Sequence, residues 1–295
     1  MADANPTLRQ RQLANRLREL RKQSGLNLAE VAEQILLSPA QVSRIENAKR
    51  IASPRDVRAL CKLYGVPEAE LLKLAKESRK REWWLDHDDP DFRQMIGLES
   101  EASEIIEYET TTIPGLLQTE GYARAIFKGY LPRIDPEVLE SRTQGRMKRQ
   151  ELLYRQHPPI YWVLLDESVL HRHVGGLQVM ADQLEQLTSL AELPQVNVLV
   201  IPFTVGAHMG FDTAFRMLRF PQDADISDTL FTEDSMGGET HEDYGPSRAR
   251  IERYREIIDH LRAAAANPTQ SIEMIRAKAM EFAQQYNESQ APTSQ

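Results

Sequence analysis

The sequence has a single cysteine, Cys61, among its 295 residues, and it contains no long apolar run. One cysteine excludes an internal disulfide framework and suits a reducing compartment; within "VRALCKLYGV" it occupies an inward helical position, which indicates a buried, inert thiol. No apolar run approaches the roughly 20 residues that a membrane-spanning helix needs, and the polar N-terminal segment lacks the apolar core of a secretory signal. We therefore expect a cytoplasmic protein that does not bind a membrane.

The usual signatures of catalysis are also missing. There is no glycine-rich phosphate loop, no G-x-S-x-G elbow and no HExxH pair. His171 and His173 lack a third ligand at a useful spacing, His208 in "GAHMG" fits an exposed loop, and "THEDYG" (residues 240–245) fits an acidic loop. We expect no enzyme, no catalytic residue, no metal site and no cofactor; an enzyme in the C-terminal part is the alternative, and these histidines would be its first candidates.

Charge is distributed unevenly along the chain. The net charge is −8 overall, but residues 1–82 hold 17 basic and 10 acidic side chains, a net charge of +7, and the remainder has a net charge of −15. A basic head on an acidic body predicts that only the head approaches a polyanion.

The length favours two domains. Residues 1–78 show five helical patterns, with Gly25 as a stop after the first and Ser38-Pro39 and Ser53-Pro54 as starts of the third and fourth. Short β-rich runs alternate with helical stretches over residues 79–285, which predicts a larger α+β domain with a mixed or antiparallel sheet. Trp83 and Trp84 are expected to pin the linker to this domain, and residues 286–295 are expected to be a disordered tail.

The stretch "SPAQVSRIENAKR" (residues 38–50) predicts a helix with two different faces. Val42 and Ile45 lie three apart on the inward side. The outward side carries short or hydrogen-bonding residues that could contact base edges in the major groove: Ala40, Gln41, Ser43, Arg44 and Asn47.

The ends of this helix carry Ser38, Lys49 and Arg50, which we expect to meet phosphates. A short helix, a tight turn and a second short helix, set among further helices, is the helix-turn-helix layout. The alternative interpretation, a polar outer face of an ordinary helical domain, stays open on pattern alone.

Residues 9–74 resemble the lambda-repressor-like (Xre) helix-turn-helix family through "LRELRKQSGLNLAEVAE", "SPAQVSRIENAKRIASP" and "LCKLYGVPEAELL". The resemblance implies that Ala40, Gln41 and Arg44 face bases and that Glu46 pairs with Arg21 as a partly buried brace. The sequence departs from the family at three positions. Leu36 stands in a turn where glycine is usual, which predicts a strained or reshaped turn there. Ala48 stands where glycine often ends the recognition helix, and Leu28 replaces a glutamine that touches phosphate.

The second part, from about Trp83 to Phe282, is similar to a group of actinobacterial regulators that join an Xre head to a C-terminal domain of unknown function. The similarity rests on "LESEASEIIEYETTTIPGLLQTEGYARA", "DESVLHRHVGG", "QLEQLTSLAELPQVNVLVIPF" and "SIEMIR". These are the Scr1-family antitoxin-like, or WhiJ-like, transcriptional regulators. The resemblance implies control through a small partner protein from a neighbouring gene and supplies no catalytic residue.

We therefore predict a nucleoid-associated, sequence-specific transcriptional regulator that binds double-stranded DNA. Because a single head covers only a half-site, we expect a homodimer on an inverted repeat, controlled through the C-terminal domain by a small partner protein or another signal. The alternative is an antitoxin-like protein that sequesters a small neighbouring protein and for which DNA binding is secondary.

Overall fold

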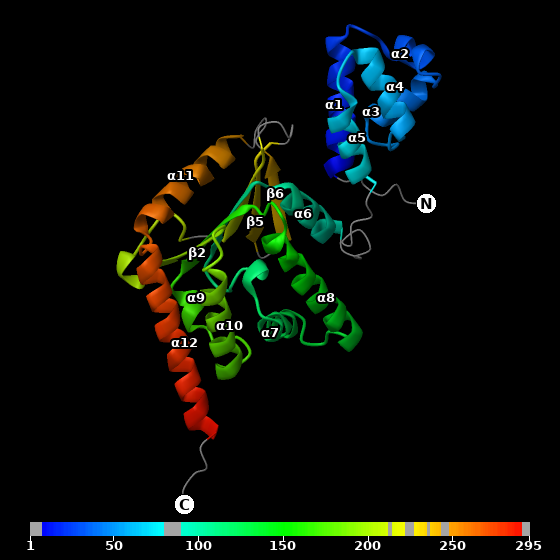
Figure 1. The fold of residues 1–295 in the computed structure, drawn as a ribbon. Coiled ribbons are helices and arrows are strands. Elements are labelled where there is room, and N and C mark those ends of the chain that lie inside the picture. Colours follow the sequence, from blue (N-terminus) through cyan, green and yellow to red (C-terminus); the bar gives the residue numbers. More distant parts are fainter. Residues whose placement is uncertain are drawn as a thin grey trace, which may run out of the picture. The chain divides into compact units, whose positions relative to one another are not determined.

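The computed structural model describes residues 8–79, 90–211, 214–221, 227–234, 237–242 and 248–290 (Figure 1). These residues form two compact units, one of which ends at Glu101 and also includes Pro221, while the other holds the described residues from Ala102 onward. Our boundary at residues 78/79 stays a prediction, and Trp83 and Trp84 lie outside the described residues.

The N-terminal unit contains the five predicted helices and one further helix. They are α1 (Leu8–Gln23), α2 (Leu28–Gln34), α3 (Pro39–Glu46), α4 (Pro54–Tyr64), α5 (Glu68–Glu77) and α6 (Pro90–Glu101). Reciprocal side-chain caps, such as that of Asn27 with Glu30, begin α2, α3 and α4. Gly25 and Gly65 follow α1 and α4 with φ of 70° and 67°, a conformation that costs glycine little.

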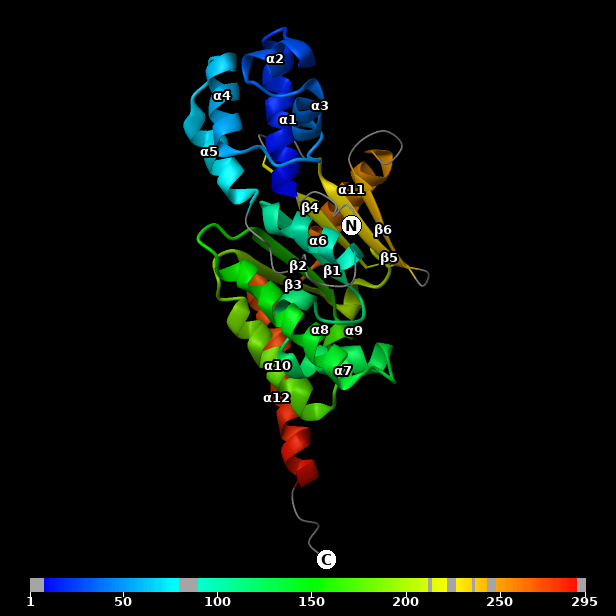
Figure 2. The same cartoon turned by 90° about the vertical axis from the view of Figure 1, so that its right-hand side faces the viewer.

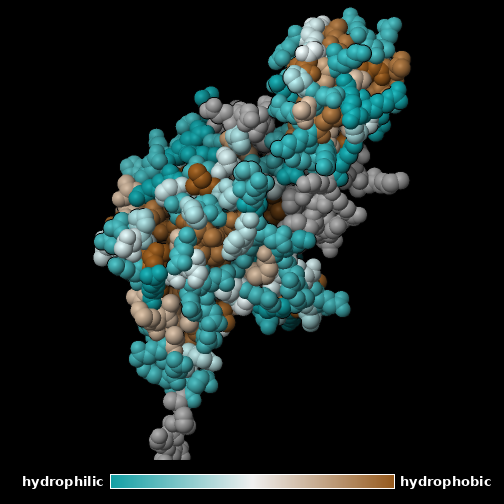
Figure 3. All heavy atoms as spheres, viewed as in Figure 1, coloured by the Kyte–Doolittle hydropathy of each residue, from teal (hydrophilic) through white to brown (hydrophobic). Residues whose placement is uncertain are grey.

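Apolar residues from all of the first five helices share one core in this unit. Leu17 of α1, Val31 of α2, Val42 of α3, Val57 of α4 and Leu71 of α5 are all buried. This core fixes the outward direction of the opposite face of each helix. Figure 3 shows that hydrophilic residues cover most of the visible face of the unit.

The C-terminal unit is built on a six-stranded mixed sheet, which confirms the α+β prediction. The strands are β1 (Glu104–Glu109), β2 (Ile160–Asp166), β3 (Val196–Ile201), β4 (Phe215–Arg219), β5 (Thr229–Asp234) and β6 (Gly237–Glu242), in the order β3-β2-β1-β4-β5-β6. The first three strands are parallel and the last three antiparallel, with Tyr108 opposite Leu164 on one side and Phe215 on the other.

Helices connect the parallel strands and cover the sheet (Figure 2). The connecting elements are η2 (Gly115–Leu117), α7 (Glu120–Tyr130), α8 (Pro136–Arg149), η3 (Gln150–Tyr154), α9 (Ser168–His171) and α10 (Leu177–Leu190). After β3 come η4 (Phe203–Val205), α11 (Arg248–Ala264) and α12 (Pro268–Gln290). Ile258 of α11 packs with Ile106 and Tyr108 on one sheet face, while α12 packs against α10 and β3.

The segment "PGLLQTEGYARA" is a hydrogen-bonded structural junction. The Tyr122 hydroxyl accepts from the Ile113 amide at 3.1 Å, and the buried Gln118 donates to the Ile113 carbonyl at 2.7 Å. Gln183 of α10 accepts from the Thr119 amide and donates to a neighbouring carbonyl. Burial, as its main cause, raises the pKa of Tyr122 to about 12, so the phenol stays protonated and able to donate.

Two local expectations need correction. Residues 240–242 of the expected acidic loop belong to strand β6, where they pair with β5. α12 continues to Gln290, so it includes the first five residues of the expected tail; the rest of the tail lies outside the described residues. Among the helices of the described ranges, none combines the length and apolar character that crossing a bilayer requires.

Candidate nucleic-acid interface

Helix α3 has a buried face and an exposed face, as its spacing predicts. Val42 and Ile45 are 1% and 2% exposed, because they reach the core of the N-terminal unit. Ala40 and Arg44 are exposed on the opposite side, and Gln41 and Ser43 are half-buried at its flanks. Within the part of the chain that the structure describes, no hydrogen bond or ion pair is recorded for the Arg44 side chain. Its guanidinium is therefore available to an external acceptor.

The start of α3 is fixed by a reciprocal cap. The Ser38 hydroxyl accepts from the Gln41 amide at 3.2 Å, and the Gln41 side-chain oxygen accepts from the Ser38 amide at 2.9 Å. Pro39 occupies the first turn, where an N–H would have no partner. Gln41 therefore uses its oxygen within the protein and keeps its amide NH₂ group for other contacts.

A buried ion pair holds α3 against α1. Arg21 donates from Nε and Nη2 to the two carboxylate oxygens of Glu46, at 2.7 and 2.9 Å, and from Nη1 to the Leu26 carbonyl at 3.0 Å. Glu46 is 4% exposed, and its hydrogen bond is the main cause that raises the pKa of Arg21 above its ordinary range. The structure thus brings together the two residues that the family resemblance paired.

Side-chain hydrogen bonds fix the C-terminal end of α3. Asn47 is exposed, but its side-chain NH₂ group donates to the Ser43 carbonyl at 2.7 Å and its oxygen accepts from Arg18 of α1 at 2.6 Å. Arg18 also donates to the Glu46 carbonyl. A base contact by Asn47 stays a prediction, and it requires these bonds to break. The role of Arg18 was not apparent from the sequence, because it depends on how α1 crosses α3.

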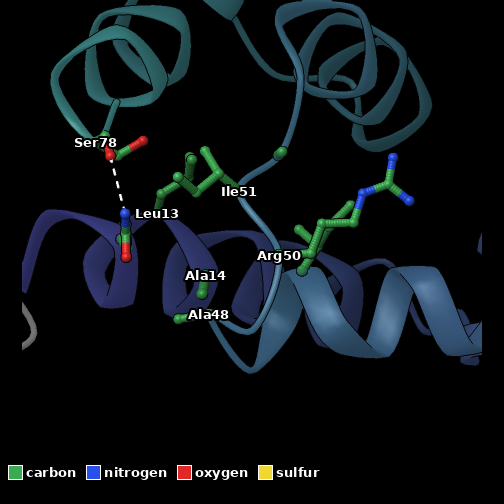
Figure 4. A pocket seen from close by; sticks show the side chains of 9 residues that line it. Leu13, Ala14, Ala48, Arg50, Ile51 and Ser78 are labelled. Atoms are coloured by element: carbon green, nitrogen blue, oxygen red, sulfur yellow. Dashed lines mark hydrogen bonds between the residues drawn. The ribbon is translucent and has the colours of Figure 1, made fainter. Parts of the chain in front are cut away.

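The residues expected to meet phosphates lie at the two ends of α3. Ser38 and Lys49 are exposed, while Arg50 is half-buried, with its Nη2 3.7 Å from an Asp56 oxygen. Figure 4 shows Arg50 directed away from a cavity of about 10 Å³ beneath the segment after α3. A space of this size holds at most one water molecule, so it is not a ligand site.

The two residues that replace glycine both have a left-handed backbone, which the sequence predicts for Leu36 only. Leu36, in the turn between α2 and α3, has φ of 57°, and Ala48, after α3, has φ of 54°. This left-handed region is unfavourable for residues with a Cβ atom. Leu36 is also 81% exposed, so its side chain gains almost nothing from the core. Leu28 is partly buried against the core of the unit.

The other candidate residues do not form a shared site. His171 contacts the Phe203 ring and His173 the Phe282 ring. The expectation that His208 is exposed is wrong: its side chain is 7% exposed, packs on Tyr108 and lies 3.7 Å from Asp166. In the described ranges, no three His, Cys, Asp or Glu side chains gather as metal ligands would.

Cys61 lies in the core of the N-terminal unit, where burial is the main cause that raises the pKa of its thiol. A protonated thiol is a weak nucleophile, so this environment suits the predicted structural role.

A buried charged cluster in the C-terminal unit was not predicted. Glu107 of β1 is 1% exposed, pairs with Arg216 and accepts from the Tyr161 hydroxyl at 2.6 Å. Burial alone would raise the pKa of Glu107, but Arg216, with help from Arg149 and Tyr161, lowers it below its ordinary value. Because Tyr161 lies on β2 and Arg216 on β4, the cluster serves as a structural anchor between these strands and β1.

Comparison with known proteins finds two domains in the chain, the second of which begins within α6. A domain of unknown function, DUF5753, matches residues 92–277, and a helix-turn-helix domain matches residues 12–74. No curated protein matches. One solved structure, described as the clp gene regulator ClgR from C. glutamicum, is 29% identical over 26% of this chain and 100% of its own, with a TM-score of 0.22.

Proposed function

We propose that this chain, which belongs to the DUF5753 family, is a sequence-specific, DNA-binding transcriptional regulator. The proposal starts from the helix-turn-helix domain that precedes the family domain. A helix-turn-helix domain supports DNA binding and transcription regulation in general. The observation that carries the specific proposal is the exposed Arg44, which projects from a helix whose opposite face and both ends are fixed.

Arg44 has the chemistry that reading a base requires. A guanidinium can donate two hydrogen bonds to O6 and N7 of guanine in the major groove. The exposed neighbour Ala40 is small, and the half-buried Ser43 is small as well, so α3 can approach base edges closely. Lys49 is exposed after the end of the helix and can neutralise a phosphate. In this arrangement the middle of α3 would contact the bases, and the ends of α3 would contact the phosphates of the DNA backbone.

The proposal includes a homodimer on an inverted repeat. One helix-turn-helix unit spans a half-site, and dimers read two half-sites about one helical turn apart. The C-terminal unit, which supplies most of the negative charge, would dimerise away from the DNA and respond to a small partner protein or another signal.

Several finer assignments rest on resemblance alone. They are the Xre subfamily, the actinobacterial Scr1-family or WhiJ-like type and the antitoxin-like alternative. The location at the nucleoid in the cytoplasm and the lack of enzyme activity are inferred from the sequence and belong to the same proposal. An antitoxin-like protein would form a stable complex with the product of the neighbouring gene, so co-purification of the two proteins addresses that alternative.

A gel-shift series on the full chain tests the proposal. Arg44→Ala is expected to weaken binding to the preferred duplex by about 1–3 kcal/mol and to relax one base position. Lys49→Ala is expected to weaken binding to all duplexes alike and to reduce the salt dependence. Lys73→Ala on α5, an exposed lysine outside α3, is the matched charge control. Equal affinities for Arg44→Ala, Lys73→Ala and the parent protein would refute the assignment.

A further inference from the structure

An open groove lies on the C-terminal unit at the carboxyl ends of two neighbouring parallel strands. Thr111 and Thr112 follow β1, Arg172 and Gly175 follow β2 and the short helix α9, and Ile126 and Tyr130 come from α7. The groove encloses about 440 Å³. Small-molecule sites commonly have volumes of about 300–1,000 Å³, and open α/β sheets bind ligands outside the carboxyl ends of their strands.

The walls of this groove are fixed by contacts outside it. Ser168 donates from its hydroxyl to the Thr110 carbonyl at 2.7 Å, which ties the segment after β2 to the segment after β1. The buried Tyr122 hydroxyl accepts a hydrogen bond from the amide of Ile113, which directly follows the groove residue Thr112. Gly175 has φ of 72° and packs so closely that a Cβ atom would lie 3.0 Å from Ala125 of α7. The groove is therefore preformed, which lowers the entropic cost of binding.

The groove combines one cation with apolar and hydroxyl groups. Over the described ranges, no hydrogen bond or ion pair is recorded for the Arg172 side chain, although the unit as a whole is acidic. Two threonines line the same groove. Helix α10 begins two residues after Gly175 with no side-chain cap, and a helix N-terminus carries positive potential. Ile126 and the 74% exposed ring of Tyr130 supply apolar contact area.

We propose that this groove binds a small amphipathic anion, such as an aromatic or branched acid. The anionic group would accept hydrogen bonds from Arg172 and the threonine hydroxyls, and the apolar body would lie against Ile126 and Tyr130. Charge-assisted hydrogen bonds to a planar guanidinium suit a carboxylate, sulfonate or phosphate. The site deepens the proposed function by giving the C-terminal unit a place for a chemical signal, but its binding needs no DNA.

Fluorescence titration of the full chain with 8-anilinonaphthalene-1-sulfonate, an amphipathic anion, tests the proposal without DNA. We expect saturable binding that Arg172→Ala weakens about tenfold and that Arg172→Lys largely retains, because the charge is kept. Gly129→Trp is expected to block the groove: Gly129 lines it, and a Cβ atom there has no neighbour within 4 Å. Gly129→Ala adds only a methyl group and is expected to bind as the parent does.

Arg133→Ala removes an exposed charge outside the residues that line the groove and is the matched control for Arg172→Ala. Circular dichroism verifies that each variant is folded, and the exposed Arg172 keeps the test decisive even if Gly129→Trp unfolds. The proposal is overturned if the probe shows no saturable binding up to about 1 mM, or if Arg172→Ala binds as tightly as Arg133→Ala. Neither result would affect the prediction of DNA binding through Arg44.

Discussion

Replacing Glu46 by glutamine should destabilise the helix-turn-helix unit strongly. The carboxylate is 4% exposed and receives two hydrogen bonds from Arg21, whose own side chain is 16% exposed. Removing one partner of a buried pair leaves the other charge buried and costs about 3–5 kcal/mol. Since Arg21 keeps its bond to the Leu26 carbonyl and some contact with water, we expect the lower end of that range, about 3 kcal/mol.

Hydrogen exchange measured on peptides of the full chain is the suitable assay, because two units need not unfold together. A loss of about 3 kcal/mol accelerates exchange of the protected amides in α1–α5 by roughly 150-fold, whereas the C-terminal sheet should not change. Arg21→Met combined with Glu46→Gln should cost clearly less than the sum of the single changes. Additive losses, or a Glu46→Gln effect below about 0.5 kcal/mol, would show that the pair does not hold α3.

Three further changes address the turn, the sheet and the helix end. Leu36→Gly should stabilise the N-terminal unit by about 0.5–1 kcal/mol, because it relieves a left-handed backbone and loses a side chain that is 81% exposed; faster exchange in α2 and α3 would contradict this. Glu107→Gln should destabilise the sheet by about 3–5 kcal/mol at neutral pH, measured by exchange in β1. Because the pKa of Glu107 is lowered in the folded state, its ionised form stabilises the fold at pH values above the pKa of an unfolded glutamate, about 4.3. This stabilisation is lost as the pH falls through the folded pKa, so the stability difference between Glu107→Gln and the parent should shrink in acid. A difference that does not change with pH would contradict this prediction. Asn47→Ala should loosen the end of α3, which faster exchange there would show; a changed base preference in a gel shift would support the predicted base contact of Asn47, and an unchanged preference would contradict it.

Much of the N-terminal unit could be predicted because its signals are local. Ser38-Pro39 and Ser53-Pro54 mark helix starts through chemistry within one turn, and Gly25 marks a stop in the same way. The left-handed backbone at Leu36 could be predicted through comparison with a family that has glycine there, whereas the same conformation at Ala48 was not predicted.

The sheet could be predicted only in part. Short apolar runs indicate β1 to β4. The acidic segment "THEDYG" (residues 240–245), which follows two glycines, indicates a loop, although its first three residues belong to β6. Strand order and direction depend on contacts between distant segments, which periodicity does not encode. The burial of His208 has the same origin, since it follows from packing against Tyr108 on β1.

The candidate interface shows a similar division. The spacing of Val42 and Ile45 placed Arg44 outward correctly, because a helix repeats every 3.6 residues. Which outward side chains are already bound could not be predicted: Asn47 is held by Arg18, 29 residues earlier in the chain. This contact depends on how α1 crosses α3. It engages the side chain at the end of α3, whereas Arg44 within the helix is left available for a base.

Selection of binding sites from a random duplex library by the full chain tests the central claim most directly. We predict enrichment of an inverted repeat with half-site centres about one helical turn apart, and loss of the preference at one position of each half-site with Arg44→Ala. Recovery of unenriched sequences, or of one unchanged motif with both proteins, would contradict the account.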